Sequence, residues 1–169
     1  IQENSPVAIR AILSHGTDTM NPLIDRMHRT LAAQRAAFSN HPYPTLDERK
    51  EKLRALKGVL RRYQDQIVVA VDADFGGRSP AETKLVEVIG PILEANHALS
   101  SLRRWMRPRR RHTEILFLSN SARVEYQPKG VVGIITPWNF PLYLALGPLI
   151  AVLAAGNRAM IKMSENSRH

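Results

Sequence analysis

Hydrophobic residues in the first hundred positions recur every three or four residues, which is the spacing of helices that bury one face. Three such stripes follow one another, over residues 18–40, 45–71 and 79–106. Their members are Leu23, Met27, Leu31 and Phe38, then Leu53, Leu56, Leu60, Tyr63, Ile67 and Val71, then Leu85, Ile89, Ile92, Asn96, Leu99 and Met106. The chain is therefore predicted to begin with a helical lead-in.

Two short motifs mark where the second and third helices begin. Thr45-Leu-Asp-Glu48 and Ser79-Pro-Ala-Glu82 both have the spacing of a capping box, in which two side chains accept hydrogen bonds from free backbone N–H groups. Pro80 strengthens the second motif, because the missing N–H of proline costs nothing at the first helical position. Gly90-Pro91 should kink or interrupt the third helix, since an interior proline removes a hydrogen bond and clashes with the preceding turn.

The periodicity changes after Pro108. Residues 114–118 and 122–127 have the character of strands, and Ser119-Asn-Ser121 between them suits a turn. These segments predict a β-hairpin. Residues 131–135 then form a continuous apolar run, which is typical of a strand buried on both faces of a parallel sheet.

The last forty residues complete a β-α-β unit. Residues 142–155 are apolar and small, as expected for a crossover helix, and Gly156-Asn157 is suited to cap its C-terminus. Residues 159–163 form the second strand. In open α/β sheets ligands bind at the carboxyl ends of the strands, so residues 136–141 and 162–165 should lie at one ligand-binding edge.

The chemistry at this edge suits a nucleotide. A carboxylate such as Glu165 commonly accepts hydrogen bonds from ribose hydroxyls, and Lys162 can donate to them. The Gly-x-Gly-x-x-Gly fingerprint is absent, because Gly130 and Gly133 lie before and within the strand instead of after it. The predicted fold class is α/β, with a helical lead-in, a β-hairpin arm and the start of a parallel, doubly wound, Rossmann-like cofactor-binding sheet.

Composition narrows the function classes. The chain of 169 residues has no cysteine, and its six histidines show no metal-ligand spacing, so a metal site is not predicted. Residues 142–155 are too few to cross a bilayer, which needs about 20 apolar residues, and the N-terminus lacks a signal-peptide pattern. A cytoplasmic location is expected.

The net charge of +9 comes largely from six arginines among the nine residues 103–111. One alternative is therefore a non-catalytic basic module that binds nucleic acid or another acidic partner through this run. No recognised nucleic-acid-binding motif accompanies the arginines. A solvated helix end is the simpler interpretation, since arginines near a helix C-terminus complement its dipole.

Three motifs in this order carry a family resemblance: Pro137-Trp-Asn-Phe-Pro141, Ala155-Gly-Asn157 and Lys162-x-Ser-Glu165. Together they resemble the aldehyde dehydrogenase superfamily. Further residues are similar to the branch of coniferyl aldehyde dehydrogenases, related to the class-three fatty and aromatic aldehyde enzymes. These are Arg103-Arg-Trp-Met106, Phe117-Leu118 and Arg123-Val-Glu-Tyr-Gln-Pro128.

The resemblance implies NAD(P)-dependent oxidation of an aldehyde to a carboxylic acid through a cysteine thioester. It assigns Asn139 as the catalytic residue that donates a hydrogen bond to the developing oxyanion. It assigns cofactor binding to Ile135, Thr136, Pro137, Trp138, Lys162, Ser164 and Glu165. Glu165 favours NAD, because a carboxylate repels the 2′-phosphate of NADP, although NADP stays possible. The alternatives without a functional role are that Asn139 is an ordinary turn residue and that Lys162 and Glu165 are solvated surface charges.

The resemblance also implies a larger protein. In the family the nucleophilic cysteine and the base glutamate belong to the later half, and this sequence has no cysteine. We therefore expect an N-terminal part of a longer enzyme, inactive alone, and a homodimer joined through the hairpin. The expected divisions are a helical lead-in over 1–111, the hairpin of the oligomerisation arm over 112–128 and the first part of the NAD(P)-binding domain over 129–169.

Overall fold

The computed structural model describes residues 21–117 and 119–169. Residues 1–20, including the expected helix start at Asp18, and Leu118, the expected end of a hairpin strand, lie outside the described residues. The elements are α2 (Pro22–Asn40), α3 (Leu46–Arg62), α4 (Gln64–Phe75), α5 (Pro80–Thr83), η2 (Lys84–Ile89), α6 (Gly90–Trp105), β1 (Arg109–Arg111), η3 (Ile115–Phe117), β2 (Ala122–Val124), β3 (Val131–Ile135), α7 (Pro141–Ala154) and β4 (Arg158–Lys162). The mixed α/β class predicted from the sequence is confirmed.

The helical lead-in is also confirmed, with a break that the hydrophobic stripe did not predict. The second predicted helix is two helices, because the chain leaves helical geometry at Tyr63 between α3 and α4. The interruption expected at Gly90-Pro91 takes the form of the π-helix η2, which leads directly into α6. A π-helical turn accommodates Pro91, which has no N–H to donate.

Only one of the two predicted capping boxes forms. The Thr45 side chain accepts from the Glu48 N–H, and the Glu48 carboxylate accepts from the Thr45 N–H at 2.6 Å. Ser79 makes no such side-chain bond, so the second box is wrong. The reason is that the Glu82 carboxylate turns to Arg78, 3.1 Å away, instead of returning to the helix start.

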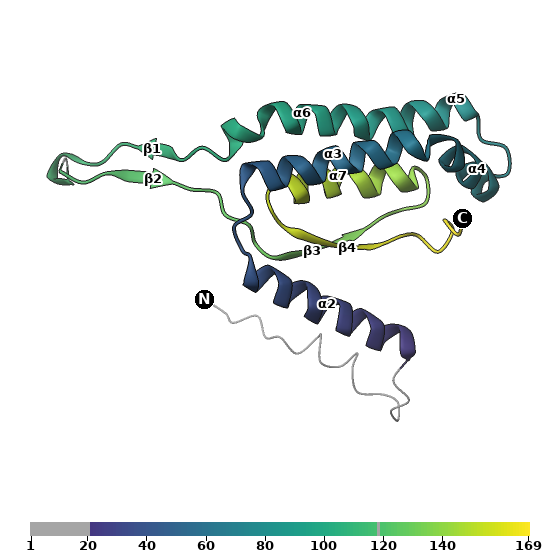
Figure 1. Cartoon of the computed structure of the whole chain (residues 1–169), viewed down its shortest axis with the longest axis horizontal. Coiled ribbons are helices and arrows are strands. Elements are labelled where there is room, and N and C mark those ends of the chain that lie inside the picture. The colour runs from purple at the N-terminus through teal and green to yellow at the C-terminus, as the bar shows by residue number, and fades with distance from the viewer. Residues whose placement is uncertain (1–20, 118) are drawn as a thin grey trace, which may run out of the picture.

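The hairpin exists, but its first strand lies earlier than predicted. β1 and β2 are antiparallel, with Arg109 opposite Val124. The predicted strand at 114–118 is wrong, because Ile115–Phe117 form a 3₁₀ turn in which the Phe117 N–H donates to the Glu114 carbonyl. The chain needs this turn to reverse between the two strands. The hairpin extends away from the body of the molecule (Figure 1).

The predicted β-α-β unit is confirmed. β3 and β4 pair in parallel, with Val131 opposite Arg158 and Ile135 opposite Lys162. The crossover helix α7 lies on one face of this sheet, and α3 and α6 pack over α7, while α2 lies on the other side (Figure 1). The core between α3, α6 and α7 consists of Leu53, Leu60, Val88, Ala95, Ala98, Leu102, Leu146, Ile150 and Ala154.

The C-terminus of α7 is closed by glycine and by an arginine from α3. Gly156 has a φ of +83°, its N–H donates to Leu153, and the Asn157 N–H donates to Val152, which confirms the predicted cap. The buried Arg49 guanidinium donates to the Ala154 carbonyl at 3.1 Å and to the Pro44 carbonyl at 2.9 Å. It packs so closely on Gly156 that a Cβ there would lie 2.7 Å from Arg49 Cζ.

We predict that Gly156→Ala lowers the free energy of unfolding by about 1–3 kcal/mol, because alanine is strained at positive φ and its methyl group displaces Arg49. Gly58→Ala is the matched control. Gly58 lies inside α3 with nothing within 4 Å of its added Cβ, so this change should stabilise the helix by about 0.5–1 kcal/mol. Urea unfolding of both variants measures the difference. If the Gly156 variant and the original protein had the same free energy of unfolding, the assigned role of Gly156 in capping α7 would be wrong.

The Thr45 capping box predicts a pH dependence of stability. Hydrogen bonds from the Thr45 backbone N–H, the Thr45 hydroxyl and His41 lower the pKa of Glu48 from 4.5 to about 2. Because the folded-state pKa is depressed, this carboxylate stabilises the fold fully above pH 4.5, and its contribution is lost as the pH falls toward 2. The urea midpoints of the original protein and Glu48→Gln should therefore differ at pH 7 and converge near pH 2.

Glu51→Gln serves as the control, since Glu51 is an exposed carboxylate one turn further along α3. Its midpoint should follow that of the original protein at both pH values. A gap between the original protein and Glu48→Gln that stays constant from pH 7 to pH 2 would contradict the assigned role of the carboxylate.

Candidate functional site

The first and third sequence motifs meet at the carboxyl edge of the two parallel strands. The Thr136 N–H, just after β3, donates to the Lys162 carbonyl at the end of β4, 3.1 Å away. The buried Thr136 hydroxyl lies 3.5 Å from the sulfur of Met163. This edge therefore brings Ile135, Thr136 and Lys162 together, as the sequence predicted for a ligand-binding edge.

The turn that follows Thr136 exposes its side chains and fixes its backbone. Pro137, Trp138 and Asn139 are exposed. The Trp138 ring packs against Phe75 at the end of α4, with centroids 5.9 Å apart. The Asn139 carbonyl accepts a hydrogen bond of 3.0 Å from Arg78. The Asn139 amide is thus an exposed donor on an anchored segment.

Arg78 is the residue that anchors this turn. Its guanidinium lies between two aromatic rings, 4.6 Å from the Phe75 centroid and 4.5 Å from the Phe140 centroid. It also pairs with Glu82 at 3.1 Å and with Glu87 at 3.4 Å, and only 6% of its side chain is exposed. A buried charge of this kind is tolerated because it is paired and hydrogen-bonded.

Glu87 connects the same cluster to α7. Its side chain is fully buried, and one carboxylate oxygen accepts a hydrogen bond of 2.6 Å from the N–H of Tyr143, in the first turn of α7. Phe140, at the N-cap position, provides no side-chain bond of its own. Burial raises the pKa of Glu87, while the Tyr143 N–H and the Arg78 charge act in the opposite direction.

Sequence reasoning missed both Arg78 and Glu87. Leu85 and Ile89 were assigned to the buried stripe of the third helix, yet Leu85 is 62% exposed and Ile89 44%. The buried face carries Thr83, Glu87, Val88, Pro91, Ala95 and Ala98. A carboxylate on a face of otherwise small and apolar residues is the signal that would have found Glu87.

The remaining predicted site residues lie at the end of β4 and just past it. Ser164 is half-buried and its hydroxyl accepts from the Asn166 N–H, whereas the side chains of Lys162 and Glu165 are exposed. The Glu165 carbonyl accepts from Arg168, whose own N–H donates to Asp74. The segment is therefore tied back to α4, and the Glu165 carboxylate remains at the surface.

Tyr143 lies in the first turn of α7 and contacts α6. Its hydroxyl donates to Glu94 of α6 at 2.7 Å, and this bond to a carboxylate raises the pKa of Tyr143. The ring also lies against Gly90, where an added Cβ would come within 3.0 Å of it. Tyr143 therefore packs α7 against α6.

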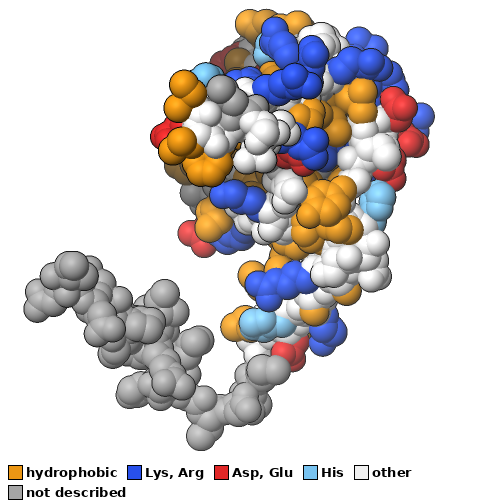
Figure 2. Space-filling view, turned by 90° about the vertical axis from the view of Figure 1, so that its left-hand side faces the viewer, with side chains coloured by type: hydrophobic (Ala, Val, Ile, Leu, Met, Phe, Trp, Pro, Cys, Tyr) orange, Lys and Arg blue, Asp and Glu red, His pale blue; other side chains and the backbone are white. Residues whose placement is uncertain are grey.

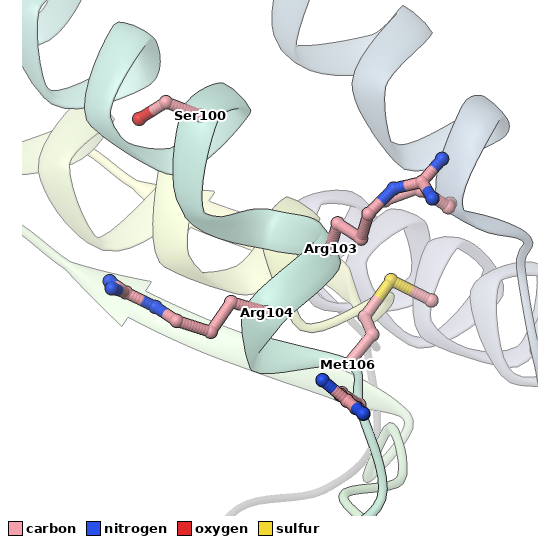
Figure 3. A pocket seen from close by; sticks show the side chains of 6 residues that line it. Ser100, Arg103, Arg104 and Met106 are labelled. Carbon is pink, nitrogen blue, oxygen red and sulfur yellow. The ribbon is translucent and has the colours of Figure 1, made fainter.

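The arginine run does not form one binding surface. Arg103, Arg104 and Arg107 line a shallow hollow of about 600 Å³, but Arg103 and Arg104 extend to opposite sides of α6 (Figure 3). On the face seen from the hairpin end, basic side chains are interspersed with hydrophobic ones (Figure 2). This arrangement gives no support to the nucleic-acid alternative.

Among residues 21–117 and 119–169, no three histidine, aspartate or glutamate side chains gather where they would hold a metal ion. None of the helices formed by these residues has the length and apolar character needed to span a membrane.

The chain is similar to aldehyde dehydrogenases in both sequence and fold. Residues 23–169 match the model of the aldehyde dehydrogenase family. A probable coniferyl aldehyde dehydrogenase of Pseudomonas aeruginosa is 44% identical over 144 residues, which cover 85% of this chain and 30% of the relative. The coniferyl aldehyde dehydrogenase of a Pseudomonas species is 39% identical over 150 residues, which cover 89% of this chain and 29% of that protein.

Solved structures agree with the sequence match. The substrate-bound AldH of Staphylococcus aureus superposes with a TM-score of 0.79 at 28% identity, covering 83% of this chain and 31% of that one. An aldehyde dehydrogenase of Brucella melitensis shares the fold, with a TM-score of 0.75 at 22% identity over 85% of this chain and 29% of that chain. The chain thus spans about 30% of the length of each of these four proteins. The anchored Asn139 turn and the family match over residues 23–169 lead to one conclusion: this chain belongs to the aldehyde dehydrogenase family.

Proposed function

We propose that this chain supplies the oxyanion donor and part of the cofactor cleft of an enzyme that oxidises an aldehyde to a carboxylic acid with NAD. One observation carries the proposal. The Thr136–Asn139 turn and the Lys162–Glu165 segment meet at the carboxyl edge of a parallel β-α-β unit, where α/β proteins bind their ligands.

In the proposed mechanism Asn139 acts on the aldehyde oxygen. A thiolate attacks the carbonyl carbon, and negative charge develops on the oxygen. The side-chain amide of Asn139 donates a hydrogen bond to that oxygen, which stabilises the tetrahedral species more than the substrate. NAD, held by the residues at the ends of β3 and β4, would supply the acceptor for the hydride that leaves the carbonyl carbon, and water would then hydrolyse the thioester to the carboxylic acid. The thiol must lie outside these 169 residues, which contain no cysteine.

The cofactor is proposed to lie along the edge of β3 and β4. Ile135, Thr136, Pro137 and Trp138 would line its cleft. The exposed Lys162 and Glu165, with Ser164 between them, would surround the adenosine ribose. Glu165 places a carboxylate where NADP would carry its 2′-phosphate, so NAD is the preferred cofactor.

The substrate class and the assembly are also proposals. Two relatives are named for coniferyl aldehyde, which favours an aromatic aldehyde for this chain. The projecting hairpin exposes Ile115 by 80% and Leu116 by 84%. Apolar side chains at such a tip are suited to burial against a second subunit, which supports a homodimer.

Asn139→Ala tests the catalytic role. In the complete enzyme it should lower kcat by about 10²–10³-fold, the usual effect of removing one oxyanion donor, while NAD affinity changes little. Turnover is measured by NADH absorbance, and affinity by quenching of protein fluorescence. Asn40→Ala, at the exposed end of α2, is the control. A correctly folded Asn139 variant with full turnover would make Asn139 a turn residue only.

Glu165→Gln tests the choice of cofactor. Removing the negative charge should weaken NAD binding and strengthen NADP binding relative to NAD, because the amide no longer repels a phosphate. The ratio of the two dissociation constants, measured in the complete enzyme, is the readout. A ratio equal to that of the original protein would remove Glu165 from cofactor selection.

A further inference from the structure

We propose that Glu87, acting with Arg78, is a positioning residue that sets the place of the Asn139 amide by holding its turn and the start of α7 to the preceding helices. This inference rests on the proposed oxyanion role of Asn139. It adds two residues that lie far in sequence from the three family-resembling motifs: Arg78, which donates to Asn139, and Glu87, which binds Arg78 and the first turn of α7.

The first step concerns the start of α7. The helix begins with Pro141 and has no side-chain cap from Phe140, so the first-turn N–H groups need another acceptor. The Glu87 carboxylate accepts from the Tyr143 N–H at 2.6 Å. It therefore takes the place of an N-cap from a different helix, and its negative charge complements the helix dipole.

The second step concerns the turn itself. Arg78 donates to the Asn139 carbonyl at 3.0 Å and pairs with Glu87 at 3.4 Å. The flanking rings of Phe75 and Phe140 leave the guanidinium little room to move. Asn139 is thus fixed through its own carbonyl by Arg78 and through the following helix by Glu87.

The third step connects this anchoring to turnover. With its backbone held, the Asn139 amide has only its side-chain torsions left to adjust. A donor that is already in place needs no reorganisation when charge develops on the substrate. Glu87 does not touch the substrate in this account; it acts on turnover through Asn139.

The decisive experiment is a double-mutant cycle in the complete enzyme. Glu87→Gln keeps the size of the side chain but turns an amide toward the Arg78 donors. It should lower kcat about tenfold, less than the about 10²-fold that a misplacement of 1 Å costs, with NAD affinity unchanged. In an Asn139→Ala background the same change should lower kcat less than about twofold, because its effect passes through Asn139.

Glu82→Gln is the matched control. Glu82 also pairs with Arg78, but its side chain is half exposed, whereas that of Glu87 is fully buried and bonds the Tyr143 N–H of α7, so kcat should change less than twofold. If Glu87→Gln does not fold, Arg78→Lys replaces it in the cycle. Lysine keeps the charge but lacks the planar guanidinium, whose Nη1 donates to Asn139 and Glu87 while Nη2 donates to Glu82, so the same non-additive loss is expected.

Two results would overturn the inference alone: full kcat in a folded Glu87→Gln enzyme, or an equal loss in both backgrounds, which a purely structural role would give. Failure of the proposed function looks different, because Asn139→Ala would then itself retain turnover, and the positioning inference would fall with it. Amide exchange over residues 139–143 gives an independent readout. It should speed up in Glu87→Gln and stay unchanged in Glu82→Gln.

Discussion

The structure depends on how the crossover helix α7 is held at its two ends. The sequence of α7 is almost entirely apolar, and at its N-terminus it has no polar cap of its own. Buried charges from earlier helices supply the partners: the Glu87 carboxylate at its N-terminus and the Arg49 guanidinium at its C-terminus. Each charge has the sign that complements the helix dipole at its end of α7. Hydrogen bonds from charged side chains therefore hold α7 to the helical lead-in, in addition to apolar packing.

This attachment joins the helical lead-in to the β-α-β unit. Arg49 binds α3 to the end of α7, and the Asn157 side chain just beyond accepts from the N–H groups of Lys129 and Gly130, where β3 begins. At the opposite end, the Arg78 and Glu87 cluster holds the turn that presents Asn139. Both ends of the crossover helix are thereby held by side chains of the preceding helices.

The sequence predicts well what depends on neighbours along the chain. The apolar run of β3, the Gly156-Asn157 cap and the Thr45 capping box all follow local rules, and all three are present. Sequence-based prediction failed where a side chain is held by a residue outside its own local motif. The Glu82 carboxylate pairs with Arg78 instead of completing the predicted capping box. The buried Glu87 carboxylate accepts from the N–H of Tyr143, which lies 56 residues later in the sequence. The position of Glu87 on a buried face can be found from the helical spacing, but the partners of Glu82 and Glu87 cannot, because such pairings carry no periodicity.

The central claim is that an anchored backbone turn directs the Asn139 amide at the reacting carbonyl. The most direct measurement is a crystal structure of the complete enzyme with NAD and an aldehyde bound as its covalent adduct. The account predicts that Asn139 Nδ2 lies about 2.7–3.1 Å from the former carbonyl oxygen, with the Arg78 bond to the Asn139 carbonyl retained. An Asn139 amide turned away from that oxygen, with another donor in its place, would contradict the account.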